Sequence, residues 1–260
     1  MVWAVALGLL IGVALGALGG GGSVLAVPTL IFVLGESAQA ATTGSLFIVG
    51  VTSVISAIAY HRDEMVRWRA GLGFGAAGIL ASVGGSVLNR QVSEEVVIIC
   101  FAGLMLISAT AMFLKSRRRP GTTEGQNADQ APFAQSATVV VQVVLAGLVV
   151  GFLTGFLGVG GGFVIVPALI LILRFPTPVA VGTSLLIIAV NSGVSLLARA
   201  GVNEFSWGDI IPFTVAAVAA SLIGKRLSAR LPARRLNQAL AGLLVLVAVF
   251  MTTKTLWAPT

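Results

Sequence analysis

Two glycine-rich interruptions of long apolar segments constrain this chain more than any other feature of its sequence. The first occupies residues 16–22, within an apolar segment from Val2 to Leu34, and the second occupies residues 155–162, within an apolar segment from Thr138 to Leu173. A continuous membrane-spanning helix needs only about 20 apolar residues, and each glycine weakens a helix by roughly 1 kcal/mol relative to alanine. Because backbone N–H and C=O groups inside lipid must find partners, we expect both breaks to be buried in protein or to line a cavity.

The composition indicates an integral membrane protein with several spans. Hydrophobic residues make up 57% of the 260 residues and charged residues only 10%, which is typical of a polytopic helical chain. The length leaves room for about eight spans of roughly 20 residues. A single His and a single Cys exclude a disulfide framework or a zinc cluster built within the chain, and we expect no metal and no organic cofactor. The apolar stretch from Val2 has no basic residues before it, so we do not interpret it as a cleaved signal peptide.

The second half of the chain repeats the first. Adding 139 to a residue number in the first half gives its counterpart without a gap, as for Pro28 and Pro167 or Trp68 and Trp207. We therefore divide the chain into a membrane repeat over residues 1–114, a polar linker over 115–137 and a second membrane repeat over 138–260. The apolar segments are Val2–Leu34, Ala40–Tyr60, Ala70–Leu88 and Val96–Leu114, then Thr138–Leu173, Val179–Ala198, Ile210–Gly224 and Leu236–Thr253. Corresponding interrupted segments in two halves point to the binding site of a transporter.

The basic residues behave as topology signals. The net charge of +7 is spread over connections between apolar segments and does not form one stripe, so it does not indicate a nucleic-acid partner. Connection 61–69, the linker and connection 225–235 are basic and are expected in the cytoplasm. The counterpart of 61–69 at 200–208 is not basic, and neither is 89–95, the counterpart of 225–235. The two repeats are therefore expected to be inserted in opposite orientations.

Inversion requires an odd number of crossings in each half. Three segments of each half are ordinary spans, so the glycine-broken segment must cross an even number of times or dip in and return. The part after the first break, residues 23–34, would be roughly 18 Å long as a helix, too short for the ~30 Å hydrocarbon core. The sequence thus predicts an all-α polytopic membrane protein of two inverted repeats. Each repeat has a glycine-broken, re-entrant or short helical hairpin plus three transmembrane helices, with the two glycine tips meeting from opposite faces.

The chemistry available inside the membrane consists of glycine backbone and hydroxyl groups. No Asp, Glu, Lys, Arg or His occurs in an apolar segment, so a catalytic base is missing and we do not expect an enzyme. A glycine turn that opens a helix leaves the first N–H groups free at the positive end of the helix dipole, which favours an anion. The candidate binding residues are Gly20, Gly21, Gly22, Ser23, Thr43, Gly44 and Ser45 in the first half, and Gly160, Gly161, Gly162, Thr183, Ser184 and Asn191 in the second.

Structural interpretations stand beside these functional ones. The glycines could serve only close helix packing, as in small-xxx-small interfaces. Hydroxyls in membrane helices commonly bond to a carbonyl of the preceding turn or link neighbouring helices. A carboxamide in hydrocarbon is costly to leave unpaired. We therefore expect the Asn191 side chain either to hydrogen-bond to a neighbouring helix or to contact the ligand.

The duplicated motif resembles a known family. The pattern Gly-x-x-Gly-x-Gly-Gly-x-x-x-x-x-Pro-x-Leu at residues 16–30 and 155–169, followed by Ala-Thr-Thr-Gly-Ser-Leu at 41–46 and Ala-Val-Gly-Thr-Ser-Leu at 180–185, is similar to the TauE/SafE sulfite exporter family. The resemblance covers nearly the whole chain apart from the linker. It implies a bacterial inner-membrane transporter of sulfur-containing anions, such as sulfite or sulfoacetate, mostly in the export direction. One departure, Ser23 where the second copy has Gly162, makes the two tips chemically unequal.

The expected function is export of a small sulfur oxyanion across the cell's inner or plasma membrane. Each negative charge that leaves a cytoplasm-negative cell gains about 2.3 kcal/mol per 100 mV, so export needs no coupling ion. The alternatives are an ion-coupled importer of a related anion and, from another class, a membrane enzyme or assembly factor. The expected partners are the small anion and the lipid bilayer, and the sequence does not indicate the oligomeric state.

Overall fold

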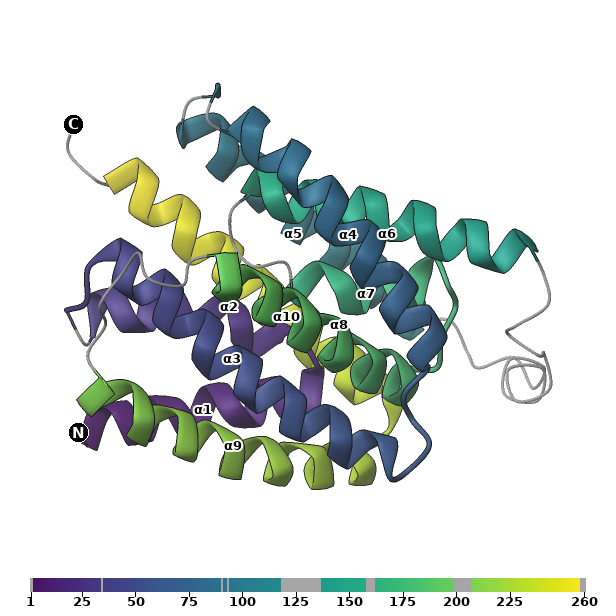
Figure 1. Cartoon of the computed structure of the whole chain (residues 1–260), viewed down its shortest axis with the longest axis horizontal. Coiled ribbons are helices and arrows are strands. Elements are labelled where there is room, and N and C mark those ends of the chain that lie inside the picture. Colours follow the sequence, from purple (N-terminus) through teal and green to yellow (C-terminus); the bar gives the residue numbers. More distant parts are fainter. Residues whose placement is uncertain are drawn as a thin grey trace.

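The computed structural model describes residues 2–33, 35–89, 91–92, 94–117, 137–157, 162–198 and 207–257, which form ten α-helices and contain no strand (Figure 1). The predicted all-α fold class is confirmed. The helices of the first half are α1 (Val2–Leu18), α2 (Gly21–Phe32), α3 (Ala38–His61), α4 (Trp68–Asn89) and α5 (Glu94–Arg117). Those of the second half are α6 (Ala137–Leu157), α7 (Gly162–Leu171), α8 (Thr177–Ala198), α9 (Trp207–Arg230) and α10 (Ala233–Trp257).

The helices of the two halves correspond one to one. The starts of α3 and α8, of α4 and α9, and of α5 and α10 are each 139 residues apart, the same offset that relates the two sequence copies. Each half thus contains a pair of helices separated by a glycine turn, followed by three further helices. α5 continues to Arg117, into the segment assigned to the linker from the sequence, and α6 begins at Ala137.

Five helices of the described part are long and apolar enough to cross a membrane, namely α3, α4, α6, α8 and α9. Three spans per half were expected, and four of the six, α3, α4, α8 and α9, meet this standard within the described residues. At 1.5 Å per residue, the 12 residues of α2 and the 10 of α7 reach only about 18 and 15 Å, too short for a bilayer core of ~30 Å.

Two pairs of helices pack with their backbones in contact. α1 lies beside α9 along one edge of the molecule, and α4 lies beside α6 along the opposite edge (Figure 1). Both pairs use glycines spaced four residues apart, since a Cβ added at any of these positions would overlap backbone of the facing helix. On α1, Gly8, Gly12 and Gly16 face Phe213, Ala217 and Ser221, and on α6, Gly147, Gly151 and Gly155 face Phe74, Gly78 and Ser82. The small-xxx-small interpretation therefore holds for the first glycine of each motif, Gly16 and Gly155.

The outside of the helical assembly is apolar and its centre is closed. Leu80 and Leu197 are 75% and 77% exposed, as expected for side chains that face lipid. α3 and α8 pack against each other between the two edge pairs, and α7 is the most enclosed helix, since residues 162–170 are all buried. Cys100 of α5 is exposed.

Candidate functional site

The first glycine turn, residues 19–22, forms because α1 ends in a left-handed residue. Gly19 has φ of +78°, a conformation that glycine adopts at little cost and that commonly ends a helix. Its N–H still donates to the carbonyl of Leu15 at 2.8 Å. Gly20 then precedes the first residue of α2 and has no side chain to cap it. The first N–H groups of α2 consequently receive no hydrogen-bond acceptor from a side chain at the capping position, Gly20.

The structure brings the first glycine turn against the start of α7. A Cβ added at Gly20 would overlap the carbonyl oxygen of Gly162, so the two backbones touch with no side chain between them. A Cβ added at Gly162 would in turn overlap the Ser23 hydroxyl. These contacts join the two glycine motifs directly.

The contact between Ser23 and Gly162 explains why the two motif copies differ there. The two residues occupy equivalent positions of the repeat, 139 residues apart, and they face each other across the junction. A side chain at both positions would be crowded, because a Cβ at Gly162 would meet the Ser23 hydroxyl and this hydroxyl would have to turn away. The inequality of the two tips therefore relieves a close contact at the junction.

The broken backbone at the end of α1 is satisfied by hydroxyl groups from three helices. Tyr60 of α3 donates to the Gly16 carbonyl at 2.9 Å, Ser184 of α8 lies 3.3 Å from the Gly19 carbonyl, and Ser23 of α2 donates to the Gly20 carbonyl at 2.7 Å. Such carbonyls have no partner within their own helix. The turn is thus fixed by α3 and α8 as well as by its own residues, as a buried break in a membrane helix requires.

The repeated hydroxyl motifs at 43–45 and 183–184 do not lie at helix starts. Their free backbone N–H groups would have been useful to an anion there, but α3 begins at Ala38 and α8 at Thr177. Each motif lies in the second turn, where backbone N–H groups bond within the helix. Only the side chains of these residues remain available to a ligand.

Two of these hydroxyls bond to carbonyls of the preceding turn. Ser45 donates to Thr42 at 2.8 Å and Ser184 donates to Val181 at 2.8 Å, which matches the structural interpretation of membrane hydroxyls. Ser184 also approaches the first glycine turn, whereas Ser45 forms no hydrogen bond to it within the described part of the chain. Of the two, Ser184 is the one brought to the junction.

The remaining members of the motifs face other neighbours. The Thr183 hydroxyl is fully buried and accepts the backbone N–H of Arg67 at 3.1 Å, so it holds the connection between α3 and α4. Thr43 is buried, with 3% of its surface exposed. A Cβ added at Gly44 would press on the Ile210 side chain of α9. These positions pack helices together at some remove from the junction.

Unpartnered polar atoms gather on the central helices α3 and α8. The Asn191 Oδ1 and the hydroxyls of Thr52 and Ser53 are buried and have no hydrogen-bond partner within the described residues. Thr52 and Asn191 are equivalent positions of the repeat, and Gly50 of α3 packs against Ser192 of α8. A buried polar atom without a partner carries a cost of about 1–3 kcal/mol, so Asn191 remains a candidate contact for a polar ligand.

The second glycine turn is described only in part. Gly160 and Gly161, two of the candidate residues, lie outside the described residues. Gly162 opens α7, and Gly21 and Gly22 form the first turn of α2. A Cβ added at Gly22 would overlap backbone of α1, which shows how closely the two arms of the first hairpin approach.

A narrow space of about 150 Å³ lies beside the first glycine turn. It is enclosed by the end of α1 and by α7, α8 and α10, and it is too tight for a water molecule. Thr177 and Asn237, which join the starts of α8 and α10 at 3.2 Å, lie on its wall. This space beside the first glycine turn therefore has no room for an anion.

Sequence reasoning missed the polar cluster at the ends of α3 and α9. Besides its bond to Gly16, the Tyr60 hydroxyl lies 2.8 Å from the Ser228 hydroxyl. Lys225 forms an ion pair with Asp63 at 2.7 Å, and its ammonium lies 5.5 Å from the centre of the Tyr60 ring. The available signal was that Tyr60 is the chain's single tyrosine. The repeat could not reveal it, because the equivalent position holds Arg199.

The described residues offer no cluster of three or more His, Cys, Asp or Glu side chains that would suit a metal ion. The chemistry at the junction is that of backbone amides and neutral oxygens. Such groups can bind and release a small ion, and they supply no general base or nucleophile.

Known proteins with similar sequences are transporters by name. A probable membrane transporter protein of Xylella fastidiosa (strain Temecula1) is 30% identical over 96% of this chain and 93% of its own length. The probable membrane transporter protein YunE of Bacillus subtilis is 29% identical over 78% of this chain and 79% of its own. A probable membrane transporter protein of Methanocaldococcus jannaschii is 24% identical over 94% of this chain and 92% of its own length. No solved structure matches the chain.

This chain is a multi-pass membrane transporter. Three observations agree on this class: its long apolar helices, the two broken helix pairs that meet in the interior, and the relatives named above. The model of the sulfite exporter TauE/SafE family matches residues 4–251, almost the entire chain, and the chain belongs to this family.

Proposed function

We propose that this protein exports a small sulfur-containing oxyanion, such as sulfite or an organosulfonate like sulfoacetate, across the inner or plasma membrane. The observation that carries the proposal is the direct backbone contact between Gly20 and Gly162, which joins the two glycine motifs in the interior. The N-termini of α2 and α7 meet there, and both present amide N–H groups and the positive ends of helix dipoles. An anion bound between them needs no cationic side chain.

The inverted repeat is part of this proposal. The end of α9 lies beside the end of α3, as the bond from Ser56 to Ser221 and the contact of Tyr60 with Ser228 indicate. The start of α4 also lies at the end of α3, since Trp68 donates to His61 at 3.0 Å. The equivalent helices α4 and α9 therefore point in opposite directions relative to α3, which supports two repeats of opposite orientation.

The same contacts support the proposed topology. The ion pair of Lys225 with Asp63 joins connection 62–67 to the end of α9, so two of the three basic connections lie at one end of the molecule. By the positive-inside rule this end faces the cytoplasm. The broken pairs α1–α2 and α6–α7 then enter from opposite faces and each returns to the face that it entered from, with α6 long enough to cross. Their short second arms, α2 and α7, meet at the glycine junction.

Transport requires the junction to open. In the closed conformation the hydroxyls of Ser23 and Ser184 donate to backbone carbonyls, and each could turn toward an oxyanion once the turns part. The first N–H groups of α2, preceded by the uncapped Gly20, supply the remaining donors. The hydroxyls of Thr52 and Ser53 have no hydrogen-bond partner among the described residues and could donate to the anion on its way through, whereas Asn191 could donate only through its amide N–H groups.

The test is counterflow of labelled anions in proteoliposomes. Gly20→Ala and Gly162→Ala should abolish transport with membrane insertion intact, because the added methyl group separates the two turns. Gly103→Ala and Gly242→Ala are matched controls: they are equivalent positions of the repeat inside helices, and an added Cβ meets nothing within 4 Å. Sulfite and sulfoacetate should exchange, while acetate and taurine should not.

Two outcomes would refute the proposal. Normal rates in both junction variants would place the site elsewhere in the protein, and equal exchange of acetate and sulfoacetate would remove the selectivity for sulfur oxyanions. Export is distinguished from ion-coupled import by charge movement in vesicles without a sodium or proton gradient. An exporter driven by the membrane potential continues under this condition, and a coupled importer stops.

A further inference from the structure

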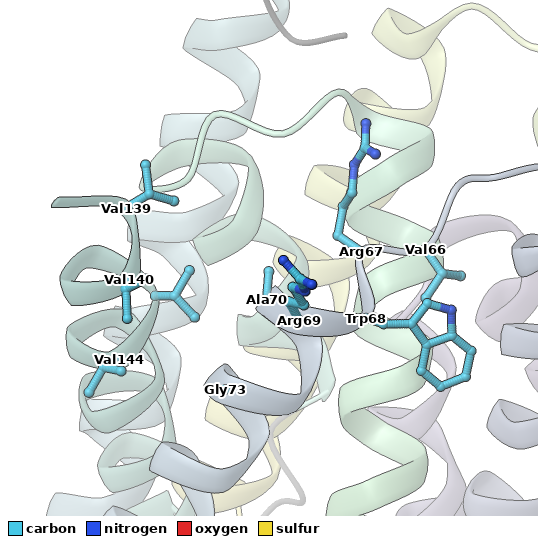
Figure 2. Close-up of a pocket in the computed structure, with 10 residues that line it drawn as sticks. Val66, Arg67, Trp68, Arg69, Ala70, Gly73, Val139, Val140 and Val144 are labelled. Atoms are coloured by element: carbon cyan, nitrogen blue, oxygen red, sulfur yellow. The ribbon is translucent and has the colours of Figure 1, made fainter. Parts of the chain in front are cut away.

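A cavity of about 420 Å³ opens on the outer surface between the first turns of α4 and α6, away from the glycine junction. Its floor and one wall are apolar, and the wall on α6 consists of valines, Val139, Val140, Val143 and Val144. The wall on α4 carries Arg67, Trp68 and Arg69, with Ala70 and Gly73 deeper in the cavity. Figure 2 shows the guanidinium of Arg69 over the gap between α4 and the valines, and Arg67 extending beyond the first turns of both helices.

Two arginines line this cavity, one on α4 and one just before it. Within the described part of the chain, neither guanidinium forms an ion pair, whereas Lys225 in the neighbouring cluster pairs with Asp63. The backbone of Arg67 is fixed by its N–H bond to Thr183, so the start of α4 holds both side chains at this end of the membrane span. Each arginine offers several donors arranged to grip the oxygens of a phosphate.

The position of the cavity matches the boundary of a bilayer. The candidate spans of α4 and α6 begin at Trp68 and Val139, and both residues line the cavity. Trp68 is 41% exposed, as is common for tryptophan at the level of lipid headgroups. Below it, Val140 and Val144 are 54% and 37% exposed and face the surroundings of the helices. A ligand here would have its charged part at the arginines and an apolar part along the valines.

We propose that this cavity binds one anionic phospholipid, with its phosphate at Arg67 and Arg69 and the upper part of an acyl chain against the valines of α6. A small free oxyanion would use the arginines but leave the apolar wall uncovered. A zwitterionic lipid would fill the apolar wall but bring a cationic group to the arginines. The anionic phospholipid matches both parts, and basic residues next to a membrane span attract such lipids.

The experiment measures lipid retention by native mass spectrometry and thermal stability in detergent. The purified full-length protein receives phosphatidylglycerol or phosphatidylcholine with identical acyl chains. We expect phosphatidylglycerol to be retained at one site and to raise the melting temperature more than phosphatidylcholine does. Arg67→Gln/Arg69→Gln should bind it about tenfold more weakly, as expected for the loss of charge-assisted hydrogen bonds. Val140→Trp, which fills the cavity from α6, should reduce retention of both lipids.

The matched control is Arg62→Gln, because Arg62 is an exposed arginine of the same connection that does not line the cavity. It should retain phosphatidylglycerol like the wild-type protein. Equal retention by the double arginine variant, or an equal loss with Arg62→Gln, would overturn the proposal. It would also fall if inorganic phosphate or sulfate at the same concentration protected the protein as well as phosphatidylglycerol does, since the site would then bind a free anion.

Discussion

Removing the Tyr60 hydroxyl tests whether the first glycine turn is fixed by α3. Tyr60 is 1% exposed, and its single proton must go to the Gly16 carbonyl, which can only accept. The Ser228 proton is then shared between the Tyr60 oxygen and the Lys225 carbonyl, which lie 2.8 and 2.9 Å away. In Tyr60→Phe the Gly16 carbonyl loses its donor at the end of α1. The expected cost is about 1–3 kcal/mol.

The assay is thermal unfolding of the purified variants in one detergent at one scan rate, because an apparent melting temperature depends on both. For a chain of this size, each kcal/mol corresponds to roughly 2–4 °C, so a cost of about 1–3 kcal/mol should make Tyr60→Phe melt about 2–12 °C below the wild-type protein. Ser228→Ala should have a smaller effect, since Tyr60 still donates to Gly16. Transport should also slow in Tyr60→Phe, because the helix end that leads into the glycine turn is held less firmly.

The matched control is Thr52→Val. It also deletes one hydroxyl from α3, at a residue that is 1% exposed, but this hydroxyl has no partner in the described structure. Valine has nearly the same shape, and removing an unsatisfied hydroxyl should leave the melting temperature unchanged or raise it. If Thr52→Val is as destabilising as Tyr60→Phe, the loss does not come from the bond to Gly16 and the reasoning is refuted.

Three further predictions separate structural from transport roles. Thr183→Val should lower the free energy of unfolding by about 1 kcal/mol, because the Arg67 N–H loses its acceptor. The affinity for the anion, measured by equilibrium binding, should not change. A large loss of affinity would show that Thr183 contacts the anion. Asn191→Leu should do the reverse. The melting temperature should stay unchanged, because the Oδ1 has no hydrogen-bond partner within the described residues, and the counterflow rate should fall, because the amide N–H groups that could donate to the anion are lost; unaltered transport would contradict this. The third prediction uses a Cys100→Ser background, because Cys100 is exposed and would itself be labelled. Single cysteines at the equivalent positions Gln91 and Arg230 should react with an impermeant reagent from opposite faces of the membrane. Labelling of both from one face would disprove the inverted repeat.

Much of the architecture could be read from local patterns. Single glycines such as Gly8 and Gly12 stay inside α1, but four consecutive glycines at 19–22 interrupt the apolar segment, so the break after Leu18 and the new helix at Gly21 follow from the sequence alone. The offset of 139 residues correctly predicts five helical elements in each half, because each copy has the same apolar periods and the same breaks. The helix boundaries were less accurate. α3 begins at Ala38 because Ser37 accepts the N–H of Ala40, a capping signal that the sequence analysis did not use.

The candidate site was predictable in outline but not in detail. The pairing of two glycine motifs pointed to the junction, and Gly20, Ser23, Gly162 and Ser184 do meet there. Thr183 was a candidate by type and spacing, yet its hydroxyl accepts from the Arg67 backbone. A hydroxyl in a membrane helix has several possible partners within reach, and spacing along the chain does not distinguish among them.

The sequence by itself determined the class of fold, because its apolar composition, its repeated breaks and the scarcity of charge leave few alternatives to a duplicated helical membrane protein. Only the tertiary structure decided which glycines pack helices and which form the junction. Gly16 and Gly20 lie four residues apart in one motif, yet Gly16 packs on Ser221 of α9 and Gly20 on Gly162 of α7. The reason is physical. A glycine permits a close approach from any side, and the element that makes the approach is set by how distant helices pack.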